Sequence, residues 1–256
     1  MRRAPARAAF RLAHLAGSGA GTLRRRLRRR LLLAQVALRA AWGQARVDCA
    51  LAPDVRLGRR VRVTVAPRTT AALHVGARSA VGDDVRIDLR GGSLVVGPDV
   101  DIRHGCVLGV SGRLELTGPA LVQHGVTLHC DEAVTVGPYA GIAEYVTVID
   151  SSHVLDGPSD WFLDDLRTAP VTIGARAWVG AKATVARGVR VGEGAVVGAN
   201  SMVVKDVPAG QLASGVPAGV VRPVGGRAVQ AAPAPERAGQ RRAGTRAPVD
   251  AVSSSS

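Results

Sequence analysis

Residues 173–208 read IGARAW-VGAKAT-VARGVR-VGEGAV-VGANSM-VVKDVP, which is six hexapeptides in succession. The first position is always Ile or Val, the second is Gly or Ala in five of the six, and the fifth is small or β-branched. A period of six differs from the period of an α-helix (about 3.6) and of an alternating strand (about 2). A short period held this strictly indicates a solenoid of stacked repeats.

Three hexapeptides make one coil of a prism, with three short strands and three corners. The aliphatic first position points into a narrow interior, and small residues fit the tight corners. Coils stack about 4.8 Å apart, and many are needed because one coil cannot bury its apolar face alone. We therefore predict an all-β parallel solenoid over residues 57–222, with Val185, Val191, Val197 and Val203 pointing inward.

The repeat extends upstream at coil length. Coil starts are assigned to Leu57, Val75, Val96, Leu116, Val136, Ile173 and Val191, with spacings of 18, 21, 20, 20, 37 and 18 residues. The 37-residue interval holds IDSSHVLDGPSDWFLDDLRTAP (149–170), which contains no hexapeptide. We interpret it as one coil interrupted by an excursion loop at 151–169, so the array has about seven coils. Loops that interrupt a repeat array tend to lie on its functional face.

The net charge of +14 is concentrated in the two tails. Residues 1–46 carry 12 Arg and no acidic residue, residues 47–226 carry 17 basic and 18 acidic residues, and residues 227–256 carry five Arg against two acids. Three regions are predicted: an Arg-rich helical segment at 1–50, the solenoid at 51–225 and a disordered tail at 226–256. The tail is rich in Ala, Pro, Gly, Arg and Ser, a composition that cannot form a core.

The N-terminal segment has an amphipathic pattern, with one helical stripe made of Leu23, Leu27, Leu31, Ala34 and Leu38 beside arginines. Two hypotheses follow for residues 23–40. The helix either contacts an anionic membrane surface, or caps the open end of the solenoid with its arginines in solvent. Nucleic-acid binding is not expected, because no aromatic residues interleave with the basic run.

Three cysteines, Cys49, Cys106 and Cys130, have no clustered spacing. This argues against a disulfide scaffold and fits a reducing cytosol, so we expect a cytoplasmic protein. The longest apolar run, residues 31–38, is interrupted by Gln35 and is too short to span a membrane.

The segments at 134–153 and 169–222, the second ending in SGVPAGVVR, resemble the maltose- and galactoside-type O-acetyltransferases of the hexapeptide-repeat acyltransferase family. The resemblance implies a left-handed parallel β-helix, acetyl-CoA as acyl donor, no metal, and a homotrimer with its chemistry in clefts between neighbouring subunits. An O-acetyltransferase acting on a sugar, glycan or glycolipid hydroxyl is expected.

His153 aligns with the family's catalytic histidine, at the start of the excursion. Acyl transfer to a hydroxyl needs a base, and an imidazole can take the proton and return it to the leaving thiolate. A base on a loop needs an orienting partner. The family has an acidic residue before the proline that rejoins the helix, which here corresponds to Asp165 or Asp164; Asp150 is a third candidate.

Other site residues are implied by the resemblance alone. Those expected at the cofactor are Trp178, Gly180, Ala181, Lys205 and Arg222. Trp178 should face outward because the interior is too narrow for it. The two basic residues would meet the phosphates of CoA, and backbone N–H groups near Gly180 and Ala181 could bind the thioester oxyanion.

The acceptor side departs from the family. Where the family commonly has Asn, the chain reads LVQHGVTLHC, so Gln123 and His124, together with Asp150, are the expected substrate-binding residues. The same segment offers a competing hypothesis, because His124 and His129 resemble two zinc ligands of γ-class carbonic anhydrases. Their third ligand is missing, since Gly109 stands in its place. A non-catalytic β-helix scaffold is the remaining alternative.

Overall fold

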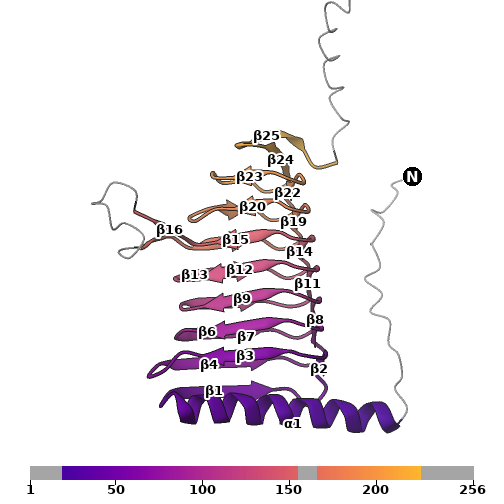
Figure 1. Cartoon of the computed structure of the whole chain (residues 1–256). Coiled ribbons are helices and arrows are strands. Elements are labelled where there is room, and N and C mark those ends of the chain that lie inside the picture. The colour runs from indigo at the N-terminus through magenta and orange to yellow at the C-terminus, as the bar shows by residue number, and fades with distance from the viewer. Residues whose placement is uncertain (1–18, 155–165, 226–256) are drawn as a thin grey trace, which may run out of the picture. The chain divides into compact units, whose positions relative to one another are not determined.

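The computed structural model describes residues 19–154 and 166–225, which form one helix followed by a parallel β-solenoid (Figure 1). Three sheets run along the solenoid, and each coil contributes one strand to each sheet. Sheet A contains β1 (Arg46–Leu51), β4 (Thr70–Val75), β7 (Gly92–Val96), β10 (Arg113–Leu116), β13 (Ala133–Val136), β18 (Val171–Ile173) and β21 (Arg190–Val191). Sheet B contains β2 (Arg56–Leu57), β5 (Ala80–Val81), β8 (Val100–Ile102), β11 (Ala120–Val122), β14 (Gly141–Ile142), β19 (Trp178–Val179), β22 (Val196–Val197), β24 (Gln211–Gly215) and β25 (Ala218–Pro223). Sheet C contains β3 (Arg62–Val65), β6 (Arg86–Leu89), β9 (Val107–Val110), β12 (Thr127–Cys130), β15 (Thr147–Ile149), β20 (Thr184–Val185) and β23 (Met202–Val203).

The predicted all-β parallel solenoid of about seven coils is confirmed, since sheets A and C have seven strands each. The chain then adds β24 in parallel to β22 and closes with β25, which runs antiparallel to β24. Val185, Val191, Val197 and Val203 are at most 1% exposed, as predicted. The interior is a column of aliphatic side chains, such as Leu73, Leu94, Leu114 and Val134, which are fully buried and follow one another in register.

The coil starts from Val75 to Val191 are confirmed by the strand register. The first one is wrong. Leu57 pairs with Val81, whereas Leu51 stacks on Val75, so the first coil begins at Arg46, inside the segment expected to be helical. The corner at 66–69 makes this coil longer than the next one. The interval from Leu57 to Val75 is by coincidence 18 residues, the length of a coil without a corner loop, so the spacing points to Leu57 as the coil start.

Helix α1 (Gly19–Trp42) closes the open end of the solenoid. Leu32, Val36 and Ala40 are buried against the first coil. Arg28 Nη1 donates to the carbonyl oxygen of Leu57 at 2.9 Å, and Arg29 Nε donates to that of Leu51 at 3.1 Å. The predicted apolar stripe is a different one, and its leucines are exposed on the other side of the helix. Among the described residues, no helix has both the length and the apolar character needed to cross a membrane.

Two edges of the prism matter for the site. The B–C edge is the stack of corners that joins sheet B to sheet C, and it carries His104, His124, Glu144, Ala181 and Asn200, linked by backbone hydrogen bonds between coils. The C–A edge joins sheet C to sheet A. It carries Arg90, Ser111, Asp131, Asp150 and Lys205. Each strand of sheet C runs from the first edge to the second.

Candidate functional site

The excursion leaves the C–A edge as a hairpin. Strands β16 (Ser151–His153) and β17 (Leu166–Thr168) pair antiparallel directly after β15, and the chain rejoins the solenoid at β18 (Figure 1). Arg187 Nε donates to Ser152 Oγ at 2.7 Å and ties the hairpin to the next coil. The array is therefore interrupted where the sequence predicts, and the interruption starts as an ordered ribbon.

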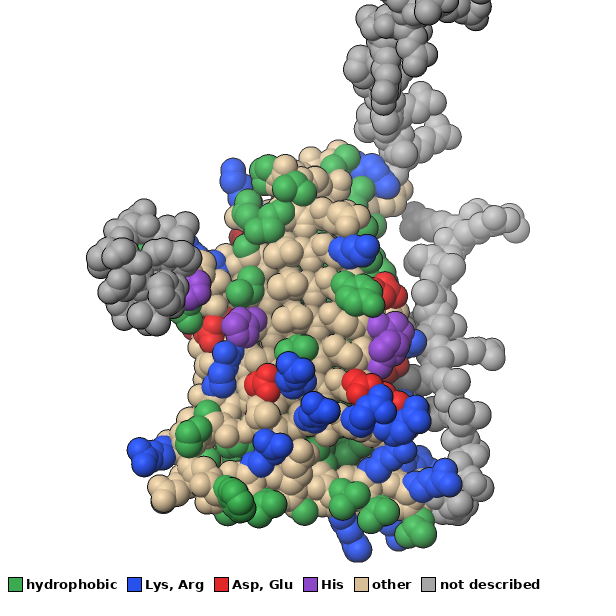
Figure 2. Space-filling model, viewed as in Figure 1, with side chains coloured by type: hydrophobic (Ala, Val, Ile, Leu, Met, Phe, Trp, Pro, Cys, Tyr) green, Lys and Arg blue, Asp and Glu red, His purple; other side chains and the backbone are tan. Residues whose placement is uncertain are grey.

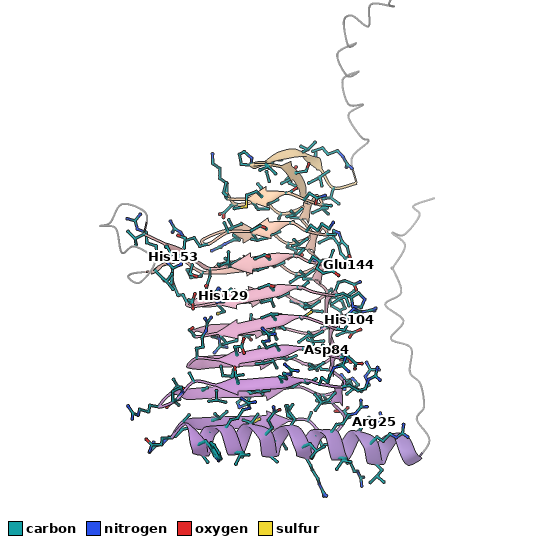
Figure 3. The ribbon with its side chains drawn as sticks, viewed as in Figure 1. Arg25, Asp84, His104, His129, Glu144 and His153 are labelled. Carbon is teal, nitrogen blue, oxygen red and sulfur yellow. The ribbon has the colours of Figure 1, made fainter. Side chains whose placement is uncertain are left out.

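His153 is exposed and lies on this hairpin opposite Leu166 (Figure 3). Its imidazole is thus accessible to a ligand at the C–A edge. Asp164 and Asp165, the predicted orienting carboxylates, lie outside the described residues. Their role as partners of His153 stays a prediction.

Asp150 has a structural position. Its side chain is fully buried, and its two carboxylate oxygens accept hydrogen bonds from the backbone N–H groups of Asp131 and Glu132, both at 2.8 Å. These bonds hold the corner of the preceding coil. The described contacts of the carboxylate are thus structural, and its roles as orienting group and substrate contact stay predictions.

A polar column missed by the sequence analysis runs beneath the hairpin. Asp131 accepts hydrogen bonds from Ser111 Oγ at 2.9 Å and from Ser151 Oγ at 2.6 Å, and Arg90 lies 3.6 Å from it. Burial alone would raise the pKa of Asp131, but the hydroxyl donors of Ser151 and Ser111 outweigh it and the pKa is lowered. The column was detectable in the sequence, because residues 90, 111, 131 and 151 recur at coil spacing.

His129 belongs to the same edge, one coil below the hairpin (Figure 3). Arg90 Nη2 lies 2.6 Å from His129 Nε2. A guanidinium can only donate, so Nε2 is the acceptor in this contact. The sequence analysis considered His129 only as a zinc ligand. Its position next to the hairpin adds it to the groups that a molecule bound at this edge would meet.

The cofactor candidates Trp178, Gly180 and Ala181 lie on another part of the prism. Trp178 is 42% exposed on β19, which confirms that it faces outward, and its ring covers Gly141 so closely that a Cβ there would lie 2.5 Å from it. The Gly180 N–H donates to Val197 O at 2.9 Å, so it cannot bind an oxyanion. The Ala181 N–H makes no hydrogen bond within the described part of the chain and is the remaining candidate of the two.

The two basic candidates are near the end of the solenoid. Lys205 is exposed at the C–A edge after β23, two coils beyond the hairpin. Arg222 is half-buried on β25, and its Nη1 donates to Pro223 O at 3.1 Å. They lie in the same terminal region, but they are not on the edge that carries Ala181.

Gln123 and His124 lie at the B–C edge, and the His124 ring stacks on that of His104 with centroids 3.7 Å apart. Burial, followed by the neighbouring charges of His104 and Arg103, lowers the pKa of His124 and favours its neutral form. The buried His124 Nδ1 meets no hydrogen-bond partner among the residues described. An open hollow of about 560 Å³ adjoins the pair, bordered by Asp84 and Asp101.

The zinc hypothesis receives no support from this geometry. His124 lies at the corner before β12, beside His104, whereas His129 lies near the end of β12, beside Arg90. Figure 3 shows His104 and His129 on opposite edges of the solenoid. Within residues 19–154 and 166–225, no group of three or more His, Cys, Asp or Glu side chains could hold a metal ion.

The comparisons with known proteins agree with this architecture. The family model for the hexapeptide repeat of succinyl-transferase matches residues 170–205. Galactoside O-acetyltransferase of Escherichia coli K12 is 34% identical over 105 residues, which are 40% of this chain and half of that protein. WcaF of the same organism, named as a colanic acid biosynthesis acetyltransferase, is 33% identical over 127 residues, covering 50% of this chain and 68% of that one.

A crystallographic structure of the polysialic acid O-acetyltransferase OatWY superposes with a TM-score of 0.57 at 16% identity and covers 70% of this chain and 88% of that one. The chain belongs to the hexapeptide-repeat acetyltransferase family, and its fold is the left-handed parallel β-helix of that family.

Proposed function

We propose that the protein is an acetyl-CoA-dependent O-acetyltransferase that modifies a hydroxyl of a sugar, glycan or glycolipid, with His153 as general base. The observation that carries the proposal is the hairpin that leaves an otherwise unbroken solenoid with an exposed His153 on it. Membership of an acetyltransferase family and relatives named for galactoside and colanic acid supply the reaction class and the acceptor class.

In this reaction the acceptor hydroxyl attacks the thioester carbonyl carbon of acetyl-CoA. His153 takes the hydroxyl proton as the new C–O bond forms, and the same proton passes to the thiolate as the C–S bond breaks. The Ala181 N–H is suited to the developing oxyanion because no described group competes for it. Asp164 or Asp165 would hold the imidazole from the excursion loop.

The CoA moiety would lie along Trp178, with Lys205 and Arg222 toward its phosphates. The exposed indole offers a flat apolar surface. The acceptor would lie near Gln123 and His124, where the hollow beside the stacked imidazoles has room for a sugar ring.

The reaction would take place between subunits. His153 projects from the C–A edge, whereas Trp178 and Ala181 belong to sheet B and the B–C edge of the same chain. A rotationally symmetric assembly brings one edge of each chain against another edge of its neighbour. We therefore propose a homotrimer in which the hairpin of one chain faces the Ala181 edge of the next.

Mixed trimers test this arrangement. His153→Ala and Ala181→Trp would each inactivate every site of their own homotrimer. Co-expressed in equal amounts, they should recover up to about a quarter of wild-type turnover, because one interface in four then joins two intact edges. Recovery near zero, with mixed assemblies verified by two affinity tags, would contradict a shared site.

The principal test is His153→Ala in an acetyl-CoA-dependent thiol-release assay with a panel of sugar acceptors. We expect kcat to fall by roughly 10²–10⁴ while KM for acetyl-CoA changes little, because the imidazole acts on the acceptor proton. His74→Ala is the matched control, since His74 lies on β4 with Asp48, far from the hairpin. Near-normal turnover of His153→Ala would show that another base does the work.

We further propose that the enzyme works in the cytoplasm, where acetyl-CoA is available. The zinc-protein alternative is not favoured by any observation, and neither is a non-catalytic scaffold.

A further inference from the structure

Helix α1 has two apolar stripes, and the solenoid uses only one. The stripe of Leu32, Val36 and Ala40 is buried against the first coil. The other stripe consists of Leu23, Leu27, Leu31, Leu38 and Trp42, whose side chains are between 55% and 85% exposed. At about 100° per residue, this exposed stripe is centred opposite the buried one. Its members Leu31, Leu38 and Trp42 also border hollows between α1 and the first coil. We call the exposed stripe the basal stripe.

Arginines border the basal stripe. Arg26 and Arg30 lie on one side of it in the helical projection, Arg24 and Arg39 lie on the other, and all four are exposed. Residues 19–42 contain seven Arg and no Asp or Glu. Figure 2 shows hydrophobic and basic side chains alternating along this end of the molecule. The basal surface of α1 is therefore both apolar and strongly positively charged.

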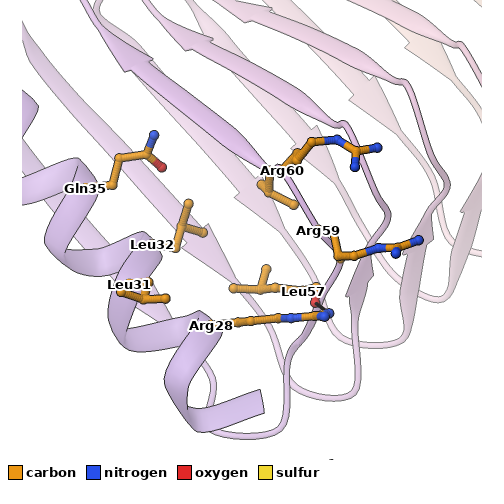
Figure 4. A pocket seen from close by; sticks show the side chains of 9 residues that line it. Arg28, Leu31, Leu32, Gln35, Leu57, Arg59 and Arg60 are labelled. Atoms are coloured by element: carbon orange, nitrogen blue, oxygen red, sulfur yellow. Dashed lines mark hydrogen bonds between the residues drawn. The ribbon is translucent and has the colours of Figure 1, made fainter. Parts of the chain in front are cut away.

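The neighbouring groove does not compete as an anion site. It has a volume of about 420 Å³ and lies between α1 and the first coil (Figure 4). Its guanidinium groups are already engaged: Arg28 with the Leu57 carbonyl, Arg59 with Asp83 and Arg60 with Asp84. The charge that remains for a partner is on the arginines beside the basal stripe.

A second copy of the chain is a poor occupant of this surface. A two-fold contact between basal stripes would bring two rows of arginines together with no acidic residue on either helix to pair with them. An anionic lipid surface satisfies both features. Leucine and tryptophan enter the interface between headgroups and acyl chains, and flexible arginine side chains reach the phosphates around them. We propose that the protein docks on anionic membranes through the basal stripe.

Helix α1 thus caps the solenoid with one face and docks on the membrane with the other. Because α1 lies across the end of the solenoid (Figure 1), docking leaves the hairpin exposed, in the fifth coil and away from the lipid. Variants of the basal stripe should consequently keep normal turnover on a soluble acceptor.

The experiment is co-sedimentation of the full chain with phosphatidylcholine vesicles that contain or lack phosphatidylglycerol. We expect binding only to the anionic vesicles, and a steep fall as salt is raised, since screening weakens exposed charges. Leu27→Ser/Leu31→Ser/Leu38→Ser should weaken binding by more than about tenfold. Arg26→Gln/Arg30→Gln should weaken it by about fivefold for each arginine.

Matched controls carry apolar-to-Ser and Arg-to-Gln substitutions at the far end of the solenoid. Val220→Ser/Val221→Ser removes exposed apolar side chains from β25, and Arg190→Gln removes an exposed charge from β21; both should bind like wild type. Circular dichroism melting should be unchanged in the leucine variant, because those side chains are exposed.

Three results would overturn the proposal: no sedimentation of monodisperse protein with anionic vesicles, unchanged binding by the leucine variant, or dissociation of a larger oligomer by that variant. The last result would make the basal stripe a contact between copies of the chain.

Discussion

Asp150→Ala separates a structural role from a catalytic one at the start of the hairpin. The side chain is fully buried, and its carboxylate is the acceptor for two backbone N–H groups, those of Asp131 and Glu132. Alanine removes both acceptors and leaves both donors without a partner. Both hydrogen bonds are part-buried. A donor left unsatisfied in such a corner costs about 1–3 kcal/mol, so the free energy of unfolding should fall by about 2–6 kcal/mol.

A loss of this size is measurable by thermal melting. For a domain of this length, 1 kcal/mol corresponds to roughly 2–4 °C, which predicts a drop of at least about 4 °C in Tm. Asp206→Ala is the matched control. Asp206 Oδ1 accepts one hydrogen bond, from the Arg190 N–H at 2.7 Å, in an exposed setting. Since water can replace that acceptor, the control should lose no more than about 1 kcal/mol.

Kinetics measured well below both melting temperatures complete the test. If Asp150 only holds the corner, kcat and KM of the folded variant stay within a few-fold of wild type. A variant with unchanged Tm and a kcat reduced as far as that of His153→Ala would refute the structural reasoning. Asp150 would then return to the catalytic site.

Three further outcomes are expected. Val191→Asp would bury an unpaired carboxylate in the aliphatic column and should lower stability by several kcal/mol in urea unfolding, whereas Val204→Asp, at a 45% exposed position, should change it by less than about 0.5 kcal/mol. Burial raises the pKa of the Cys106 and Cys130 thiols to about 11 and about 12, so a thiol reagent at neutral pH should modify them only after denaturant is added. The lowered pKa of Asp131 means that its charged form stabilises the fold at neutral pH; the Tm advantage over Asp131→Asn should shrink below about pH 4 as the carboxylate protonates, and an advantage that persists in acid would contradict this.

The interior of the solenoid was predictable because one physical constraint repeats at every coil. A narrow prism accepts only aliphatic side chains, so the first position of each hexapeptide reveals strand, register and burial together. The prediction failed at the first coil, where that logic is weakest. The corner at 66–69 shifts the spacing so that Leu57 rather than Leu51 appears to begin the coil.

The orientation of helix α1 was not predictable from hydrophobicity. The leucine stripe at Leu23, Leu27 and Leu31 is the more apolar one, yet the smaller stripe of Leu32 and Val36 faces the solenoid. The first coil has open backbone carbonyls on its lower side, and arginines beside the smaller stripe reach two of them. The helix face that packs on the first coil is therefore the one whose arginines can donate to these carbonyls. A hydrophobicity pattern in the sequence does not show this match.

The residues at the corners are a second feature that the local sequence pattern does not predict. Positive φ angles usually call for Gly or Asn. At the B–C edge, Arg60, Asp84, Tyr145 and Lys182 all have φ between 55° and 60°. Stacking between coils compensates for this strain. Arg60 pairs with Asp84 one coil above, and the Tyr145 ring lies where a Cβ at Gly125 would come within 2.5 Å of it. Such pairs are visible only once the register is known.

The separation of the two edges follows from the same geometry and limits how the enzyme can work. Each coil is closed by three strands around a filled interior, so no side-chain motion can bring the C–A and B–C edges of one chain together. A reaction that needs both His153 and the Ala181 N–H must therefore join two chains. If one edge sufficed, His153→Ala and Ala181→Trp would not both inactivate the enzyme. The mixed-trimer measurement thus tests whether each active site combines the C–A edge of one chain with the B–C edge of another. The test does not depend on which acceptor the enzyme uses.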